Sequence, residues 1–455
     1  MLYRKAETEI NKWIKDMDCA LLVTGARQVG KTYIIRECLK NSGYDVLEIN
    51  LVKQPQYLTI FNSLLTRNIN DFIESLSLIA QKTLNKSKTI IFIDEVQECK
   101  EILTAIKFLV EDNTYKYVLS GSLLGVELVD LRSAPVGYLR TIEMFPLDFE
   151  EFLIANGLEN KFIKQLKENF EKKTPILDIL HEKVLDAFHK YLIIGGMPKA
   201  VQKYIETNDY IEVSEIHKEI IKEYLVDFTK YENNKSLKLK LRNIYNLIPS
   251  ELNSHNKRYI FTHLDKNLKM DRYENSFNWL IDAGVALPVF NTTEVKVPLE
   301  INKKANIFKL FLSDVGLLTT LYGTSTILKL LSKEKDINYG AVYENFVCQE
   351  LRAHGYKQYF YNSKKYGELD FVIEHMGEVV PIEVKSGKDY KVHSALNNVK
   401  ENNVYSIKQA FVLSNFNISN DGIITYYPIY MTMFIDERSI DLPKIEKIDF
   451  SILNN

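Results

Sequence analysis

The segment Gly25–Thr32, GARQVGKT, constrains the fold of this chain more than any other feature. It matches the pattern Gly-x-x-x-x-Gly-Lys-Thr at every fixed position. The apolar run Cys19–Thr24 before it predicts a buried strand, and Tyr33–Lys40 after it predicts a helix. In such a strand–loop–helix, successive backbone N–H groups face a phosphate group at the positive end of the helix. The segment therefore predicts a phosphate-binding loop; the alternative is a glycine-containing turn that binds nothing.

Different residues of this loop are expected to hold different parts of a nucleoside triphosphate. The glycines let the backbone bend around the β-phosphate, Lys31 reaches the β- and γ-phosphates, and Thr32 holds Mg²⁺. ATP and Mg²⁺ are the predicted cofactors. The predicted nucleotide contacts are Gly25, Ala26, Arg27, Gln28, Val29, Gly30, Lys31, Thr32 and Tyr33.

Length and composition place this loop in a folded chain of several domains. With 455 residues the chain is too long for a single core, and about three domains are expected. The formal net charge of −2 gives no general attraction to nucleic acid or membrane, so DNA binding needs a local basic face. The four cysteines lack Cys-x-x-Cys spacing, which argues against structural zinc and a disulfide framework. Neither a signal segment nor a long apolar run occurs, so we expect a cytoplasmic protein.

A second strand is expected at Lys88–Glu95, where four consecutive apolar residues suit a central strand covered on both faces. Its acidic end points into the crevice beyond the carboxyl end of the strand, where ligands of α/β sheets bind. We expect Asp94 to support the Mg²⁺ held by Thr32, and Glu95 to polarise the attacking water. The alternative is a strand end with two solvated acids.

A third strand is expected at Tyr115–Ser120 and again ends in polar residues. Ser120 or Ser122 can sense the γ-phosphate or position a water molecule through its hydroxyl group. A serine-rich turn between a strand and a loop explains the same residues equally well.

These segments together resemble a family of prokaryotic AAA-type ATPases. Besides the loop, the motifs that match are Ile93–Gln97, Leu119–Ser122, Phe145–Phe152 and Gly195–Pro198. The resemblance implies ATP hydrolysis and, in many members, assembly into rings through an arginine finger. Members usually carry a Gly-Arg pair before the Pro-Leu signature, whereas this chain has Gly137-Tyr-Leu-Arg140. Arg132 and Arg140 are therefore candidate fingers or ordinary salt-bridging arginines, and both a homo-oligomer and a monomer are compatible with the sequence.

The middle of the chain predicts helices. From Pro146 to about Tyr231, apolar residues recur at three- and four-residue spacing, which we interpret as a helical lid of the ATPase. Within it, the pair Gly195-Gly196 is expected to end a helix rather than to contact nucleotide.

A winged-helix arrangement is expected after this lid. The helix-sized segments Leu241–Ile248, Arg258–Leu268 and Arg272–Ala283 precede Val285–Phe290 and Glu294–Pro298, which alternate like a hairpin. In such a fold the third helix can enter a major groove. A local basic cluster is formed by Lys257, Arg258, Lys266, Lys269 and Arg272. Nearby acids dilute this cluster, so a protein–protein or structural role is an equal alternative.

The last third of the chain contains a second group of chemically informative residues. A helix is expected at Tyr343–Leu351, followed by strands at Gly367–Ile373 and Val379–Gly387 with a turn at Met376-Gly377. Asp370 lies in the first strand, while Glu383 and Lys385 share a face of the second. Two acids on adjacent strands can bind a divalent cation, and a lysine beside them can polarise water. The predicted metal ligands are Glu344, Asp370 and Glu383, and the predicted catalytic residues are Asp370, Glu383 and Lys385.

This order of helix and strands resembles the restriction-endonuclease-like superfamily, whose signature is Pro-Asp followed by Asp/Glu-x-Lys. Leu369 replaces the proline of that signature. A helix at Lys391–Ile407 and a strand at Gln409–Ser414 complete the expected core. The resemblance implies metal-dependent nuclease chemistry; a degenerate DNA-binding or assembly domain is the alternative.

The sequence thus predicts a multidomain α/β protein. The expected domains are an ATPase core at 1–145, a helical lid at 146–232, a winged-helix-like domain at 233–300 and a restriction-endonuclease-like domain at 301–455. We expect ATP hydrolysis to control DNA binding or processing, with DNA favoured over RNA. A nucleotide-dependent switch or assembly protein with an inert C-terminal domain is the alternative.

Overall fold

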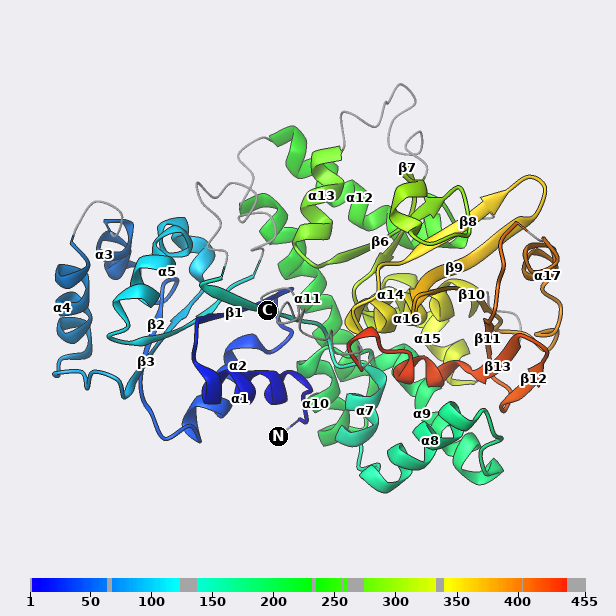
Figure 1. Cartoon of the computed structure of the whole chain (residues 1–455), viewed down its shortest axis with the longest axis horizontal. Helices are drawn as coiled ribbons and strands as arrows, with labels where there is room; N and C mark the ends of the chain where they lie inside the picture. Colours follow the sequence, from blue (N-terminus) through cyan, green and yellow to red (C-terminus); the bar gives the residue numbers. More distant parts are fainter. Residues whose placement is uncertain are drawn as a thin grey trace, which may run out of the picture.

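Two β-sheets lie at opposite ends of the molecule, and helices fill the space between them (Figure 1). This computed structural model describes residues 2–63, 68–122, 137–230, 235–254, 257–259, 274–332, 339–402 and 404–439. None of the described helices is both long enough and apolar enough to cross a bilayer.

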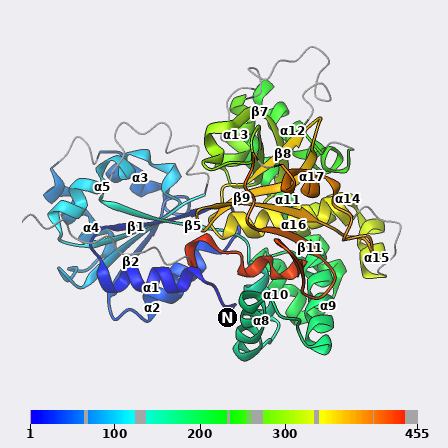
Figure 2. The ribbon, with the colours of Figure 1, turned by 45° about the vertical axis from the view of Figure 1, so that its right-hand side comes forward.

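The N-terminal sheet consists of five parallel strands in the order β2-β3-β4-β1-β5. Its strands are β1 (Ala20–Gly25), β2 (Asp45–Asn50), β3 (Thr89–Asp94), β4 (Lys116–Ser120) and β5 (Leu139–Met144). β1, β3 and β4 confirm the three strands predicted from the sequence. β5 forms the edge of the sheet that faces the rest of the molecule (Figure 2). A parallel α/β sheet of this kind fits the core of a P-loop ATPase.

Helices cover both faces of the N-terminal sheet. They are α1 (Ala6–Asp16), α2 (Lys31–Lys40), α3 (Leu58–Asn62), α4 (Ile69–Ala80) and α5 (Lys100–Asp112). Along β3, Ile90 and Phe92 pack in one core with α1 and α2, whereas Ile91 and Ile93 pack in another with α3 to α5. A strand buried on both faces has no polar positions, which explains the continuous apolar run of β3.

The strand register brings polar residues together at the carboxyl edge of this sheet. Asp94 pairs in register with Asn50 of β2 and with Ser120 of β4. Ser120 in turn pairs with Val23 of β1, two residues before the phosphate-binding loop begins. The ends of four neighbouring strands therefore surround one position beside the loop.

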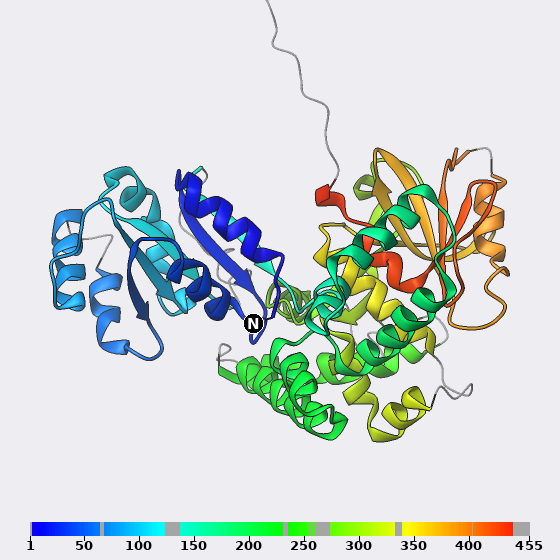
Figure 3. The same cartoon turned by 90° about the horizontal axis from the view of Figure 1, so that it is seen from below.

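The helices of the middle region do not form a core of their own. They are α7 (Phe149–Ala155), α8 (Asn160–Lys172), α9 (Asp178–Ile194), α10 (Pro198–Thr207) and α11 (Tyr210–Lys230). Their apolar residues share one core with the C-terminal sheet, from Leu147 to Ile435. Figure 3 shows these green helices beside the yellow and orange elements. The predicted lid is thus packed mainly on the C-terminal unit.

The predicted winged-helix region differs from expectation in its hairpin. The described helices are α12 (Lys235–Asn253) and α13 (Glu274–Asp282). Most of the helix predicted at Arg258–Leu268 lies outside the described residues, as do Lys266, Lys269 and Arg272. The second strand predicted at Glu294–Pro298 is wrong: β6 (Ala286–Thr292) pairs instead with β7 (Lys303–Leu312) and with β8 (Tyr359–Ser363). The predicted boundary at residue 300 separates two paired strands.

The C-terminal sheet is mixed and has eight strands in the order β12-β13-β11-β10-β9-β8-β6-β7. Its other strands are β8 (Tyr359–Ser363), β9 (Gly367–His375), β10 (Glu378–Val384), β11 (Ala410–Ser414), β12 (Ser419–Asp421) and β13 (Ile424–Pro428). Its accompanying helices are α14 (Val315–Tyr322), α15 (Thr324–Leu331), α16 (Tyr339–Ala353) and α17 (Ser394–Lys400). At the tip of the β9–β10 hairpin, Met376 and Gly377 have φ of 52° and 78°, values that a tight two-residue turn requires.

Helices cover this sheet on both faces. α16 packs in the large central core together with Phe371, Ile382 and Leu413. α17 packs in a smaller core on the other face, where Val372 and Val412 lie. The chain therefore runs from α16 through three strands to α17 and back to the sheet at β11. The helix predicted at Lys391–Ile407 is shorter than expected.

Candidate functional site

The phosphate-binding loop joins β1 to α2 in a conformation that depends on glycine. Gly25 has φ of 136° and Gly30 has φ of 93°, values that other residues rarely adopt. A Cβ atom at Gly25 would lie 2.1 Å from the carbonyl oxygen of Met144 on β5. The first glycine is thus needed for the close approach of two strands as well as for the turn.

Lys31 folds back into this loop. Its Nζ donates hydrogen bonds to the carbonyl oxygens of Gly25, at 3.0 Å, and Ala26, at 2.8 Å. Burial lowers the pKa of Lys31 to about 8, although the nearby charges of Glu95 and Asp94 oppose this shift. The ammonium group therefore lies inside the loop, where a bound phosphate group would stabilise its charge.

Asp94 connects the loop to three strands. Thr32 Oγ1 donates to its carboxylate at 3.1 Å, and Asn50 Nδ2 donates to it at 2.8 Å. Ser120 Oγ donates a third hydrogen bond to the same carboxylate. Asp94 is only 3% exposed, so these donors are what make a buried carboxylate tolerable. The side chains fit a Mg²⁺ site in which Thr32 is a ligand and Asp94 lies behind it.

Glu95 follows in a backbone conformation that is unusual for its residue type. Its φ is 62° and its ψ is 46°, in the left-handed region, and such non-glycine residues cluster at functional sites. Gln97 Nε2 donates to Glu95 Oε2 at 2.6 Å and so orients the carboxylate. Ser122 is buried, and its hydroxyl group has no hydrogen-bond partner in the described part of the chain. The structure thus brings Lys31, Thr32, Asp94, Glu95 and Ser120 to one edge of the sheet.

Two side chains of the loop are engaged elsewhere. Arg27 Nη1 lies 2.6 Å from Asp227 Oδ1, and Gln28 Nε2 donates to Glu223 Oε2 at 2.5 Å. Tyr224, on the same helix α11, donates to the carbonyl oxygen of Arg27 at 3.1 Å. Arg27 and Gln28 therefore tie the loop to the middle helices, a role that the sequence motif did not indicate.

A cavity of about 400 Å³ lies beside the start of α2. It is lined by Leu2 and Arg4 of the N-terminal segment, by Gly30, Tyr33 and Ile34, and by Pro198, Lys199 and Gln202 of α10. Arg4 Nη1 donates to the carbonyl oxygen of Val29 at 2.8 Å. The predicted helix stop is confirmed, because α9 ends at Ile194 and α10 begins at Pro198. The same turn, however, also places Pro198 against this cavity.

Of the two candidate arginine fingers, Arg140 lies away from the loop within this chain. Arg140 lies at the start of β5 in register with Leu21, whereas the loop follows the opposite end of β1. Its guanidinium group lies 3.6 Å from Asp16 and 3.4 Å from Asp18. Arg132 lies outside the described residues.

A second group of charged residues lies where α16 meets the C-terminal sheet. Lys385 Nζ lies 3.3 Å from Glu383 Oε2, and the backbone N–H of Val384 donates to Asp370 Oδ2 at 2.9 Å. The sequence did not indicate that Lys257 pairs with Glu344, or that Lys309 Nζ lies 2.8 Å from Glu368 Oε1. The C-terminal charge cluster consists of Lys257, Arg258, Lys309, Glu344, Glu368, Asp370, Glu383 and Lys385.

Burial sets the electrostatics of this cluster. Burial, together with the charge of Asp370, raises the pKa of Glu383 to about 8, and Lys385 opposes this shift. The pKa of Glu344 is raised for the same two reasons, against the opposing charges of Lys257 and Lys309. Burial lowers the pKa of Lys309, but Glu344 and Glu368 outweigh it and the net shift is upward. The two carboxylates therefore keep Lys309 charged at neutral pH.

Ammonium groups lie beside Glu344 and Glu383, two of the carboxylates predicted to hold a metal ion. Over the residues that the structure describes, no three or more histidine, cysteine or acidic side chains are grouped so as to hold a metal ion. Glu344, Asp370 and Glu383 all belong to the described residues. Lysine ammonium groups lie against Glu344 instead.

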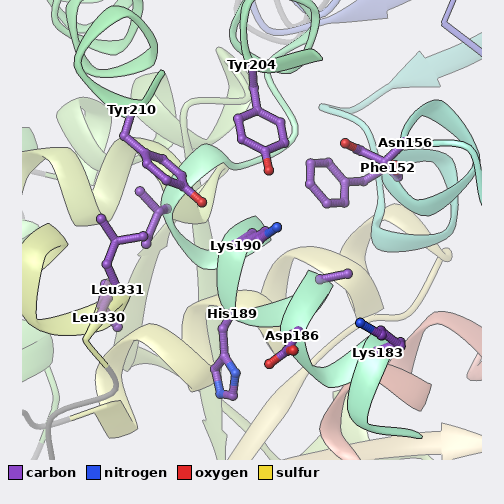
Figure 4. Close-up of a pocket in the computed structure, with 12 residues that line it drawn as sticks. Phe152, Asn156, Lys183, Asp186, His189, Lys190, Tyr204, Tyr210, Leu330 and Leu331 are labelled. Atoms are coloured by element: carbon purple, nitrogen blue, oxygen red, sulfur yellow. The ribbon is translucent and has the colours of Figure 1, made fainter. Parts of the chain in front are cut away.

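Another cavity, of about 460 Å³, lies among the middle helices, away from both groups (Figure 4). Lys183, Asp186, His189 and Lys190 line it from α9, and Tyr204 and Tyr210 approach from α10 and α11. Its lysines are exposed to solvent.

Comparison with protein-family models gives matches to separate parts of the chain. Residues 18–153 match an AAA domain. Residues 185–328 and 339–431 match domains of unknown function, DUF8612 and DUF4143. The AAA match supports an AAA-type ATPase and, with it, ATP binding and hydrolysis.

The solved structures that resemble this chain do so only distantly. A Walker-type ATPase of Pyrococcus abyssi, PABY2304, is 13% identical, and the match covers 71% of this chain and 96% of that chain at a TM-score of 0.42. The Pif1 helicase from Candida albicans is 13% identical, over 40% of this chain and 47% of that chain, at a TM-score of 0.25. No curated protein gives a match.

Proposed function

We propose that this protein is an ATP-hydrolysing switch whose nucleotide site controls the C-terminal unit. The observation that carries the proposal is the contact of Thr32 with Asp94, at 3.1 Å, beside Lys31 and Glu95. In the proposed reaction Lys31 stabilises the charge of the β- and γ-phosphates. Glu95, oriented by Gln97, positions the attacking water and accepts its proton.

Thr32 and Asp94 would hold Mg²⁺ in this site. The ion, when bound, neutralises charge on the phosphate oxygens. The chain supplies the other interactions. Asn50 and Ser120 hold Asp94 in place by hydrogen bonds, and the backbone N–H groups of the loop surround the phosphates. We propose that the adenine base of ATP binds in the neighbouring cavity, because this cavity opens beside Gly30 and Tyr33.

Glu95→Gln tests the proposed role of Glu95. The amide keeps the shape of the side chain but cannot accept a proton, so we expect turnover to fall about 100- to 10,000-fold. ATP affinity should stay within a few-fold of wild type, because Glu95 acts on water rather than on the nucleotide. Steady-state ATPase assays and equilibrium ATP binding measure the two quantities.

Glu98→Gln is the matched control for that experiment. Glu98 lies on the same short turn, three residues further along the chain, and should leave turnover unchanged. A Glu95→Gln protein that hydrolyses ATP at the rate of Glu98→Gln would exclude Glu95 as the base.

The proposed route from the nucleotide site to the C-terminal unit begins at Arg4. Arg4 bonds to Val29 in the loop and to the carbonyl oxygen of Phe145, at 2.6 Å, and its Nε lies 3.2 Å from Glu151. Glu151 belongs to α7, where it caps the helix together with Asp148. The loop and the start of α7 are therefore held by one guanidinium group.

The route continues from Asp148 to α16. His354 Nε2 lies 3.3 Å from Asp148 Oδ2, and Glu350 Oε1 accepts from the N–H of Phe149 at 3.0 Å. Lys5 Nζ lies 2.7 Å from the same aspartate. His354 and Glu350 are fully buried. Glu350 lies on α16, which also carries Glu344 of the C-terminal charge cluster, and His354 directly follows the last residue of this helix.

Arg4→Gln tests this route. We expect the free energy of unfolding to fall by about 3 kcal/mol, because Glu151 would be left buried without its partner. Adding Glu151→Gln should recover part of the loss, since it removes the unpaired charge. In the Arg4→Gln protein, ATP should no longer change hydrogen exchange of the α16 amides. Urea denaturation and hydrogen-exchange mass spectrometry provide these readouts.

Arg36→Gln is the control, because Arg36 forms an exposed ion pair with Glu48. This substitution should lower the free energy of unfolding by less than about 1 kcal/mol. Equal losses in Arg4→Gln and Arg36→Gln, or an unchanged α16 response to ATP, would contradict the proposed route.

Nucleic acid, and DNA before RNA, is the proposed partner of the C-terminal unit. The support for this partner is the resemblance of the sequence to restriction endonucleases. Lys257 and Arg258 do not add to this support, because they pair with Glu344 and Glu368. The competing second proposal is cleavage by Asp370, Glu383 and Lys385, the chemistry that the resemblance to restriction endonucleases implies. Loss of Mn²⁺-dependent plasmid nicking in Asp370→Ala tests it. Assembly into a homo-oligomer is also proposed, because the candidate finger Arg140 pairs with Asp16 and Asp18 at the opposite end of β1 from the loop.

A further inference from the structure

Two ammonium groups lie among the carboxylates that were predicted to bind a metal ion. Lys257 Nζ bonds to Glu344 Oε1. Lys309 Nζ lies 3.8 Å from the other oxygen of Glu344 and 2.8 Å from Glu368. The side chains of Lys309 and Glu344 are 0% and 1% exposed. These contacts are therefore interior ion pairs, unlike the exposed pairs of the molecular surface.

Cationic side chains of the chain itself lie beside three of the four carboxylates of the cluster. Each of the three glutamates has a cationic neighbour: Lys257 and Lys309 at Glu344, Arg258 and Lys309 at Glu368, and Lys385 at Glu383. Asp370 instead accepts the backbone N–H of Val384 and lies near enough to raise the pKa of Lys257. A group of buried carboxylates is stable only with counter-charges, and here lysines from the chain itself provide them.

The lysines arrive from elements that do not belong to the helix and strands of the predicted site. Lys309 lies on β7, and Lys257 lies in the segment 257–259. That segment is fixed in place by its neighbours: the N–H of Tyr259 donates to Phe308 O at 3.0 Å, and its hydroxyl donates to Ile244 O at 3.1 Å. A tethered ammonium group acts at a high effective concentration, so a dissolved cation would have to displace it.

We infer that the ammonium groups of Lys257 and Lys309 take the place of a divalent cation in the C-terminal charge cluster. The cluster then joins the segment 257–259, β7 and α16 by internal ion pairs. It neither binds Mg²⁺ or Mn²⁺ nor cleaves phosphodiesters. This inference opposes the second proposal, cleavage, and is independent of ATP hydrolysis at the phosphate-binding loop.

Mn²⁺ binding to the nucleotide-free, full-length protein tests the inference. Titration followed by electron paramagnetic resonance should show no stoichiometric site in wild type at submillimolar Mn²⁺. Lys257→Met should gain one site, because it uncovers Glu344, and adding Asp370→Asn should remove that site. A wild-type site that Asp370→Asn abolishes, or a folded Lys257→Met protein with no gain, would overturn the inference.

Thermal stability gives a second test that needs no variant. The melting temperature of nucleotide-free wild type should be the same in EDTA and in millimolar Mn²⁺, because the counter-charges are covalently attached. A melting temperature that falls in EDTA and is restored by Mn²⁺ would overturn the inference. ATPase activity is measured on the same preparation, so a failed ATPase proposal would be recognised separately.

Discussion

Lys31→Ala is expected to lower ATP turnover about 1,000-fold, in line with the loss of one preorganised donor to a reacting oxyanion. Lys31 is held inside the loop by the carbonyl oxygens of Gly25 and Ala26. Burial already lowers its pKa to about 8, so its charge is poorly compensated without a ligand. A triphosphate supplies the missing negative charge, and ATP affinity should therefore fall as well, by about tenfold or more. Turnover and equilibrium ATP binding measure the two effects.

Lys40→Ala is the control for this experiment, because Lys40 ends the same helix and is exposed. It should leave both quantities unchanged. Circular dichroism of the two variants checks that α2 is intact in each. Turnover by Lys31→Ala within tenfold of that by Lys40→Ala would mean that the loop does not act on the transferred phosphate.

The ATPase core could be predicted because its evidence is local in the sequence. One motif fixes the turn between β1 and α2, and strand ends supply Asp94 and Ser120 at the same edge of the sheet. Asn50 could not be predicted although it follows the same rule, since half of the residues of the strand that it ends are polar and only Ile49 among them is buried. The partners of Arg27 and Gln28 were missed because α11 lies about 200 residues further along the chain.

The C-terminal unit was predicted less completely because some of its buried residues are charged, which interrupts the apolar pattern expected of a buried strand. Lys309 is fully buried on β7, so the strand Lys303–Leu312 does not read as an apolar segment. Apolar and polar residues alternate more regularly in Glu294–Pro298, so the sequence predicts the second strand there instead. The helices of the predicted lid pack on the C-terminal sheet, and periodicity shows that a helix has an apolar face without showing what covers it.

Gly196→Ala is expected to cost about 3 kcal/mol or more of folding free energy, because the added methyl group has no space. A Cβ atom at this position would lie 2.0 Å from the carbonyl oxygen of Leu147. The backbone cannot yield easily, since the N–H of Leu147 donates to Gly196 O at 2.7 Å. On its other side, the N–H of Gly196 donates to Asp314 Oδ2 at 2.6 Å.

The same substitution is expected to weaken ATP binding. Asp314 also caps α14 by accepting the N–H of Leu317 at 3.0 Å, and burial raises its pKa to about 6. At neutral pH it is therefore a charged anchor that joins α14 to the turn before Pro198. Displacing this turn would move Pro198, which lines the cavity beside the loop. Urea denaturation and ATP titration of the same variant follow both effects.

Gly387→Ala is the matched control, because a Cβ atom there meets nothing within 4 Å. It should change the free energy of unfolding by less than about 0.5 kcal/mol and leave ATP binding unaltered. If Gly196→Ala changed the free energy of unfolding as little as Gly387→Ala, the turn at Gly196 could accommodate a methyl group without losing stability. The C-terminal unit would then not position the wall of the nucleotide cavity. A destabilised Gly196→Ala protein that binds ATP normally would instead confine Asp314 to a packing role, and the nucleotide site would communicate with α16 through Arg4 alone.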